Sequence, residues 1–211
     1  MELRLTPGAP GVGGKVHIVW QIVLGITPTT VTLFLLAALA VALGFALWAA
    51  LDPTGGAPRR TARALLAGWL LVLLVATLAP SQPIGSGDAT VWWRPGEGLF
   101  DLGAQLEPGE LAMLVRRQTA NAALFVPAPL LLRFAAPRVP LAGAFLLGVG
   151  LCLVIETAQL LMRAGRIADI DDVLCAAAGT VIGSGLALVG QLTVAAMRRR
   201  GLPRRAVRAA P

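Results

Sequence analysis

Long apolar runs alternate with short charged segments along most of the chain. A helix needs about 20 predominantly apolar residues to cross the hydrocarbon core of a bilayer, and several of these runs reach that length. The pattern therefore predicts an all-α integral membrane protein, built as a bundle of about five transmembrane helices. The predicted spans are residues 28–51, 64–80, 119–135, 139–163 and 171–197.

The spans make up one predicted helical membrane domain, residues 28–197, with a polar outer loop at 81–115. An N-terminal segment, 1–27, precedes it, and a basic tail, 198–211, follows it. Two arrangements stay open for the apolar residues 18–26. They lie at the membrane interface, or they extend the first span outward.

Local signals place two of the helix boundaries. Thr27 and Pro28 favour a helix start, because threonine caps a helix and proline suits its first turn. Pro127 and Pro129 lie inside the third predicted span. Proline removes an intrahelical hydrogen bond, so we expect a kink or a break there.

The arginines predict the orientation of the bundle. The tail, the 52–63 loop and the 133–138 turn are rich in arginine and contain a single acid, Asp52. Cytoplasmic loops carry an excess of Lys and Arg, so we expect the C-terminus in the cytoplasm and the N-terminus outside. The alternative of four spans with an interfacial N-terminal segment leaves the last four spans unchanged.

Composition agrees with this class and excludes others. The chain has 211 residues, of which 56% are hydrophobic and 14% charged, below the roughly 25% charged residues of soluble domains. Its net charge of +7 lies mostly beside apolar runs, so we expect no binding to nucleic acid. Cys152 and Cys175 fall within apolar runs and read as packed thiols. His17 is the only histidine, which excludes a metal centre built from histidines.

Polar residues within the apolar runs mark the candidate site. Glu156, Gln159 and Arg163 are separated by three and four positions, so they share one helix face. A carboxylate in a membrane span is costly, so it usually faces the protein interior and is often functional. A purely structural ion pair between Glu156 and Arg163 is the alternative.

Two neighbouring spans are expected to add polar groups at a similar depth on the outward side. Asp169 and Asp172 lie at the start of the fifth span, where acids meet the positive end of the helix dipole. Asn121 enters from the third span. Simple helix capping by the aspartates, and interface anchoring by the nearby arginines, remain the alternatives. The candidate ligand-binding residues are Asn121, Glu156, Gln159, Arg163, Arg166, Asp169 and Asp172.

Three short motifs occur in this region in a fixed order. They are N-x-x-L-F-x-P from Asn121, E-x-x-Q from Glu156, and R-x-x-D-I-x-D from Arg166. Together with the glycines that follow, they resemble the VanZ-like family of bacterial integral membrane proteins. The resemblance covers about residues 110–190. One departure is Ala176, at a position where the family pattern usually has asparagine.

The resemblance implies a multi-pass protein of the bacterial plasma membrane. The founding member of the family is associated with resistance to the glycopeptide antibiotic teicoplanin. The leading hypothesis is therefore an outward-facing polar pocket that binds a membrane lipid or a lipid-linked envelope precursor. In this hypothesis Arg163 and Arg166 meet phosphate or carboxylate, and Asn121 and Gln159 orient the ligand.

Other functions remain as alternatives. In an enzyme, Glu156 is the candidate general base, and Asp169, Asp171 and Asp172 are the candidate ligands of a divalent cation, the only cofactor expected. A structural partner within an envelope complex of membrane proteins stays open. A transporter is disfavoured, because five spans are few and no internal repeat is visible.

Overall fold

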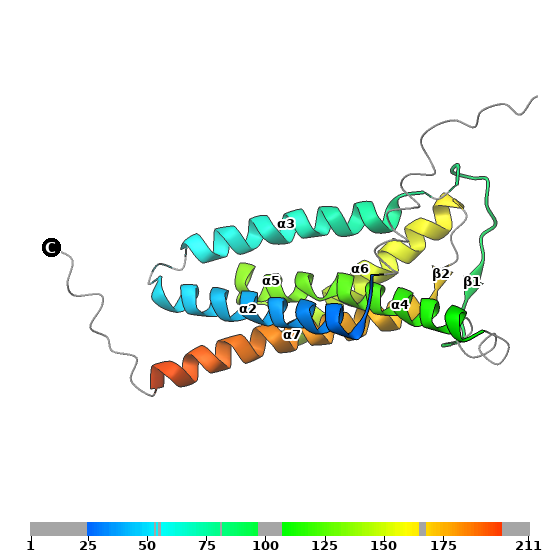
Figure 1. Cartoon of the computed structure of the whole chain (residues 1–211). Helices are drawn as coiled ribbons and strands as arrows, with labels where there is room; N and C mark the ends of the chain where they lie inside the picture. Colours follow the sequence, from blue (N-terminus) through cyan, green and yellow to red (C-terminus); the bar gives the residue numbers. More distant parts are fainter. Residues whose placement is uncertain are drawn as a thin grey trace, which may run out of the picture.

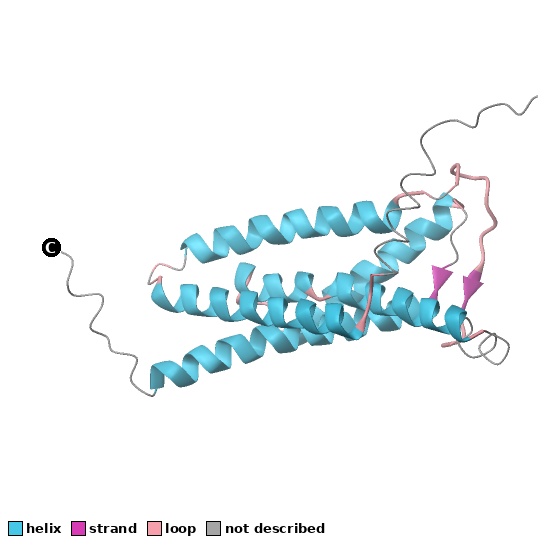
Figure 2. Ribbon diagram, viewed as in Figure 1, coloured by secondary structure: helices cyan, strands magenta, loops and turns pink. Residues whose placement is uncertain are grey.

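The computed structural model describes residues 25–52, 54, 56–80, 82–96, 107–164 and 168–199. Helices dominate, with one short pair of strands (Figures 1 and 2). The choice between the two arrangements of residues 18–26, and most of the basic tail, lie outside the described residues. The elements in chain order are α2 (Pro28–Leu51), α3 (Gly56–Leu78), β1 (Val91–Trp92), α4 (Pro108–Phe125), α5 (Pro127–Ala135), α6 (Leu141–Met162), β2 (Ala168–Asp169) and α7 (Ile170–Arg199).

Four helices, α2, α3, α6 and α7, are long and apolar enough to cross a membrane. They expose large apolar side chains along their length, for example Leu71 at 63% and Val154 at 65% exposed. Such surfaces suit contact with lipid. The prediction of an all-α, multi-pass membrane protein is therefore confirmed.

The third predicted span, 119–135, is wrong in where it begins, and the structure has two helices there. The helix begins earlier, at Pro108, and α4 ends at Phe125 before α5 starts at Pro127. Each proline removes a donor from the helical ladder, so the expected break is confirmed. The nine residues of α5 reach about 14 Å, which is too short for a hydrocarbon core of about 30 Å.

The other boundaries differ by smaller amounts. Thr27 caps α2 as expected, and its hydroxyl accepts a hydrogen bond from the Thr30 N–H at 3.2 Å. Helix α3 starts at Gly56 rather than at residue 64. Its first two turns carry arginines, so an apolar pattern alone could not assign them to the helix.

Helix α7 is the centre of the bundle. It packs against α2, α4, α5 and α6, whereas α3 packs mainly on α5. Glycines allow the closest approaches. A Cβ atom at Gly179 would collide with the Ala122 carbonyl oxygen, and one at Gly183 would collide with that of Val126. The spacing of these glycines thus marks close helix packing.

The two ends of the bundle differ in charge. Figure 1 shows the C-terminal end of α7 and the α2–α3 connection together at one end, and β1, β2 and the start of α4 at the other. The first end is rich in arginine. We call the second end, where Glu156 and the aspartates of α7 lie, the acidic end.

Candidate functional site

A small parallel sheet brings the loop after α3 to the acidic end. Val91 pairs with Ala168, and Trp92 pairs with Asp169. The Ala168 N–H also donates to the Thr90 carbonyl oxygen at 3.1 Å. No pattern in the sequence predicts this contact, because strands of two residues are too short to carry one. Through this strand pairing, the loop covers the start of α7.

Glu156 lies inside this end of the bundle. Its side chain is 9% exposed, and Oε2 accepts a hydrogen bond from the Asp169 N–H at 3.3 Å. Gln159, one turn further along α6, is also buried and donates to the Thr77 carbonyl oxygen of α3 at 2.8 Å. The prediction that both face the protein interior is confirmed. Gln159 joins α6 to α3, and Glu156 joins α6 to the start of α7.

Asp172 is bound by α4. Asn121 donates from Nδ2 to Asp172 Oδ1 at 2.6 Å. Arg117 Nη2 lies 3.6 Å from Asp172 Oδ2, and its side chain is 45% exposed. The structure therefore brings Asn121 and Asp172 together as expected. It adds Arg117, which was not among the predicted site residues although a spacing of four from Asn121 places both on one helix face.

The other two aspartates organise the turn before α7. Asp169 Oδ1 accepts the N–H of Asp171 at 2.9 Å. The Asp171 carboxylate accepts the Gly96 N–H, with oxygens at 2.8 and 3.0 Å. Burial raises the pKa of the Asp169 carboxyl, and the hydrogen bond from Asp171 opposes this rise. Capping of the helix start, one of the alternatives, is thus realised.

These partners separate the three candidate cation ligands. Asp171 is held by Gly96, and Asp172 is held by α4. Among the described residues, no group of three or more acidic, cysteine or histidine side chains is placed to hold a metal ion. The arrangement does not assemble Asp169, Asp171 and Asp172 into a common ligand set.

The structure describes one of the two predicted arginines, Arg163, and does not bring it to the buried carboxylates. Arg163 ends α6 in the left-handed conformation, with a φ of 47°, and its side chain is exposed. It forms no ion pair with Glu156, so the structural pair considered from the sequence is wrong. Arg166 lies outside the described residues.

The two thiols and the variant position are packed. Cys152 is buried and Cys175 is half-buried, and both are free. The expectation of packed thiols is confirmed. Ala176 is fully buried beside Cys152 and Ile155. In this chain the position where the family usually has asparagine is therefore part of the apolar core.

A known protein family matches the part of the chain that contains the candidate site. A family model described as VanZ/LLP1 matches residues 64–191, more than half of the chain. This range contains Asn121, Glu156, Gln159 and the aspartates of the α7 start. No curated protein and no solved structure gives a significant match. The chain therefore belongs to the VanZ/LLP1 family.

Proposed function

We propose that this VanZ/LLP1 protein lies in the bacterial plasma membrane with its acidic end outward. There it binds an amphipathic, lipid-linked component of the cell envelope, and through that binding it alters susceptibility to glycopeptide antibiotics. The ligand has a polar headgroup with hydroxyl or amide donors, and apolar chains that remain in the bilayer.

The distribution of arginine supports this orientation. One end of the bundle carries arginines at or near the ends of α3, α5 and α7. They are Arg59, Arg60, Arg133, Arg138 and Arg198. Cytoplasmic loops carry such an excess of positive charge. In this orientation α4 and α5 cross together, and the acidic end faces outward.

Glu156 is the observation that carries the proposal. A carboxylate can accept about four hydrogen bonds, yet within the described residues Glu156 accepts one, from Asp169 at 3.3 Å. The remaining acceptor capacity suits donors from a ligand, such as the hydroxyl and amide groups of a sugar or peptide headgroup. The half-exposed Arg117 supplies a positive group for a phosphate.

Helix α6 offers a surface for the apolar part of the same ligand. Leu153 is 49% exposed and Leu161 is 76% exposed, on the helix that carries Glu156. A lipid-linked molecule could place its chains along this helix in the outer leaflet and its headgroup at the acidic end. We place binding ahead of catalysis because Asp171 and Asp172 are already engaged by protein groups.

Native mass spectrometry of the full chain in mild detergent tests the proposal. We expect a lipid-sized adduct on the wild type that is strongly reduced in Glu156→Gln, which keeps the shape of the side chain. Asp88→Asn is the matched control, because Asp88 is an exposed loop carboxylate at the same end. It should keep the adduct.

A second variant makes the test decisive. If the adduct persists when Glu156→Gln is combined with Arg117→Gln, the proposed site is wrong. The cluster would then hold the helices together, as expected of a structural partner in an envelope complex. In parallel, susceptibility to a glycopeptide should change on expression of the wild type and not on expression of Glu156→Gln.

A further inference from the structure

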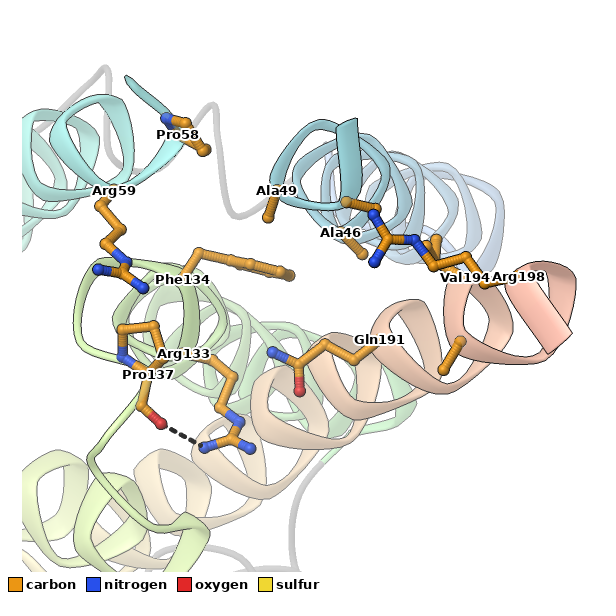
Figure 3. A pocket seen from close by; sticks show the side chains of 12 residues that line it. Ala46, Ala49, Pro58, Arg59, Arg133, Phe134, Pro137, Gln191, Val194 and Arg198 are labelled. Carbon is orange, nitrogen blue, oxygen red and sulfur yellow. Dashed lines mark hydrogen bonds between the residues drawn. The ribbon is translucent and has the colours of Figure 1, made fainter. Parts of the chain in front are cut away.

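A pocket of about 320 Å³ opens at the arginine-rich end of the bundle, and Figure 3 shows the side chains that line it. The acidic end lies at the other end of the bundle (Figure 1). Helices α2, α3, α5 and α7 contribute its walls. Its volume falls within the range of roughly 300–1,000 Å³ that small-molecule sites occupy. Arg59, Arg133 and Arg198 line it together with Gln191, and no acidic residue is among the described residues that line it.

We propose that this basic pocket binds the phosphate of an anionic membrane lipid, with the start of an acyl chain against its apolar wall. Basic pockets between membrane helices on the cytoplasmic side are suited to lipid headgroups, because guanidinium groups match phosphate in geometry and charge. The pocket lies at the end that we place in the cytoplasm. Its occupant is independent of the ligand at the acidic end.

The arginines are available for a ligand. Within the described part of the chain, Arg59 and Arg198 form no hydrogen bond and no ion pair, and both are exposed. Arg133 donates through Nη1 to the Val139 carbonyl oxygen at 3.0 Å, which fixes its guanidinium group. Among the described residues, its buried Nε has no hydrogen-bond partner.

Part of the pocket wall is apolar. Ala46, Ala49 and Ala50 of α2 face Phe134 of α5, whose ring stacks on Phe45 at a centroid distance of 5.4 Å. Figure 3 shows Arg59, Arg133 and Gln191 around the ring of Phe134. The combination of a cationic side and an apolar wall favours a lipid over a free phosphate ion.

The surroundings also suit a lipid. Next to the pocket alanines on α2, Leu47 is 44% exposed and Leu51 is 68% exposed, so this helix presents an apolar surface at the same level. The carboxylate of the nearby Asp52 is engaged by backbone N–H groups. It accepts hydrogen bonds from the Thr54 N–H at 2.9 Å and the Ala57 N–H at 3.3 Å, around the start of α3.

The experiment compares two pairs of charge-neutralised variants of the full chain. Arg59→Gln with Arg198→Gln removes two pocket arginines. Arg60→Gln with Arg199→Gln removes the same charge at adjacent positions that do not line the pocket. The probe is phosphatidylglycerol, titrated in detergent and followed by native mass spectrometry, beside phosphatidylcholine with the same acyl chains.

We expect the first pair to weaken phosphatidylglycerol binding about tenfold or more, and the second pair to leave it within about twofold. Phosphatidylcholine should bind the wild type less well than phosphatidylglycerol. An equal loss in both pairs would overturn the proposal, because it would show attraction to overall charge. Competition by glycerol phosphate at the same concentration would also overturn it, because the ligand would then be the free phosphate.

A steric variant tests the apolar wall without changing charge. Ala49→Phe would fill the pocket, and Ala37→Phe is its control on an exposed part of the same helix. We expect the first to reduce phosphatidylglycerol binding and the second to have no effect. Equal binding in Ala49→Phe and the wild type would contradict the placement of the acyl chain.

Discussion

Asn121 donates a hydrogen bond to Asp172 over 2.6 Å and so connects α4 to the first turn of α7. The two residues are 51 positions apart in the sequence. Arg117 lies on the same face of α4 and adds a positive charge to the Asp172 carboxylate at 3.6 Å. One carboxylate is thus recognised by two groups of one helix, which fixes the register of α4 on α7.

Removing the amide should weaken this connection. Asn121→Ala is expected to lower the free energy of unfolding by about 1 kcal/mol, the order found for polar contacts between membrane helices. Unfolding by a denaturing detergent measures it. Thr119→Ala is the control, because among the described residues the Thr119 hydroxyl bonds within its own helix, to the Val115 carbonyl oxygen. Equal effects of both variants would contradict the role of Asn121.

The glycines of α7 should tolerate substitution unequally. Gly179→Ala places a methyl group against the Ala122 carbonyl oxygen, so we expect a loss of about 1–3 kcal/mol from overpacking. Gly185→Ala on the same helix meets open space and should be neutral, or stabilising by about 0.5–1 kcal/mol. Thermal unfolding of both variants distinguishes them. A stable Gly179→Ala would show that α4 and α7 are packed less closely.

Trp69 stabilises the helix break between α4 and α5. Its indole N–H donates to the Leu124 carbonyl oxygen at 3.0 Å, in the last turn of α4. Carbonyl groups of a last turn lack partners within the helix. Trp69→Phe should therefore cost about 1 kcal/mol of stability. Trp48→Phe, at a half-exposed position of α2, should cost less, and the opposite order would refute this role.

Burial of Asp169 predicts a dependence of stability on pH. Its pKa is raised above the ordinary value of 3.8, so just above that value the folded protein binds more protons than the unfolded chain. The contribution of this group to stability therefore falls as pH rises above the ordinary carboxyl pKa, and it is regained on acidification. Asp169→Asn keeps an acceptor for the Asp171 N–H and cannot ionise.

The variant should accordingly gain stability relative to the wild type as pH rises above the ordinary carboxyl pKa of 3.8. Detergent-induced unfolding at several pH values measures the difference. Asp88→Asn, in the exposed loop, controls for the loss of one negative charge. A difference between Asp169→Asn and the wild type that is constant with pH, or that shrinks on going to neutral pH, would contradict the assignment.

The proposed orientation predicts which surfaces are accessible in intact cells. In a background without Cys152 and Cys175, Ile84→Cys places a thiol at a position that is 70% exposed, near the acidic end. A membrane-impermeant maleimide should label it in intact cells. Thr54→Cys, in the connection between α2 and α3, should react only after lysis. The reverse pattern would invert the orientation.

The main features of the fold follow from local pattern. Apolar runs of sufficient length predict helices in lipid, because a spanning segment must satisfy its own backbone hydrogen bonds. Proline at 127 predicts the break for the same local reason. The start of α3 was misplaced because the arginines of its first two turns interrupt the apolar pattern that marks a membrane span.

The candidate site was predictable only in part. The sequence by itself determined the membrane class, and it marked Glu156, Gln159 and Asn121, because a polar group in an apolar run is costly and must face protein. Tertiary structure alone decided which group meets which. Gly96 contacts Asp171 through its backbone N–H. Every residue except proline carries such a donor, so no side-chain pattern could predict this contact. The arginine pocket likewise forms from four helices that are separate in sequence, and only their packing brings its charges together.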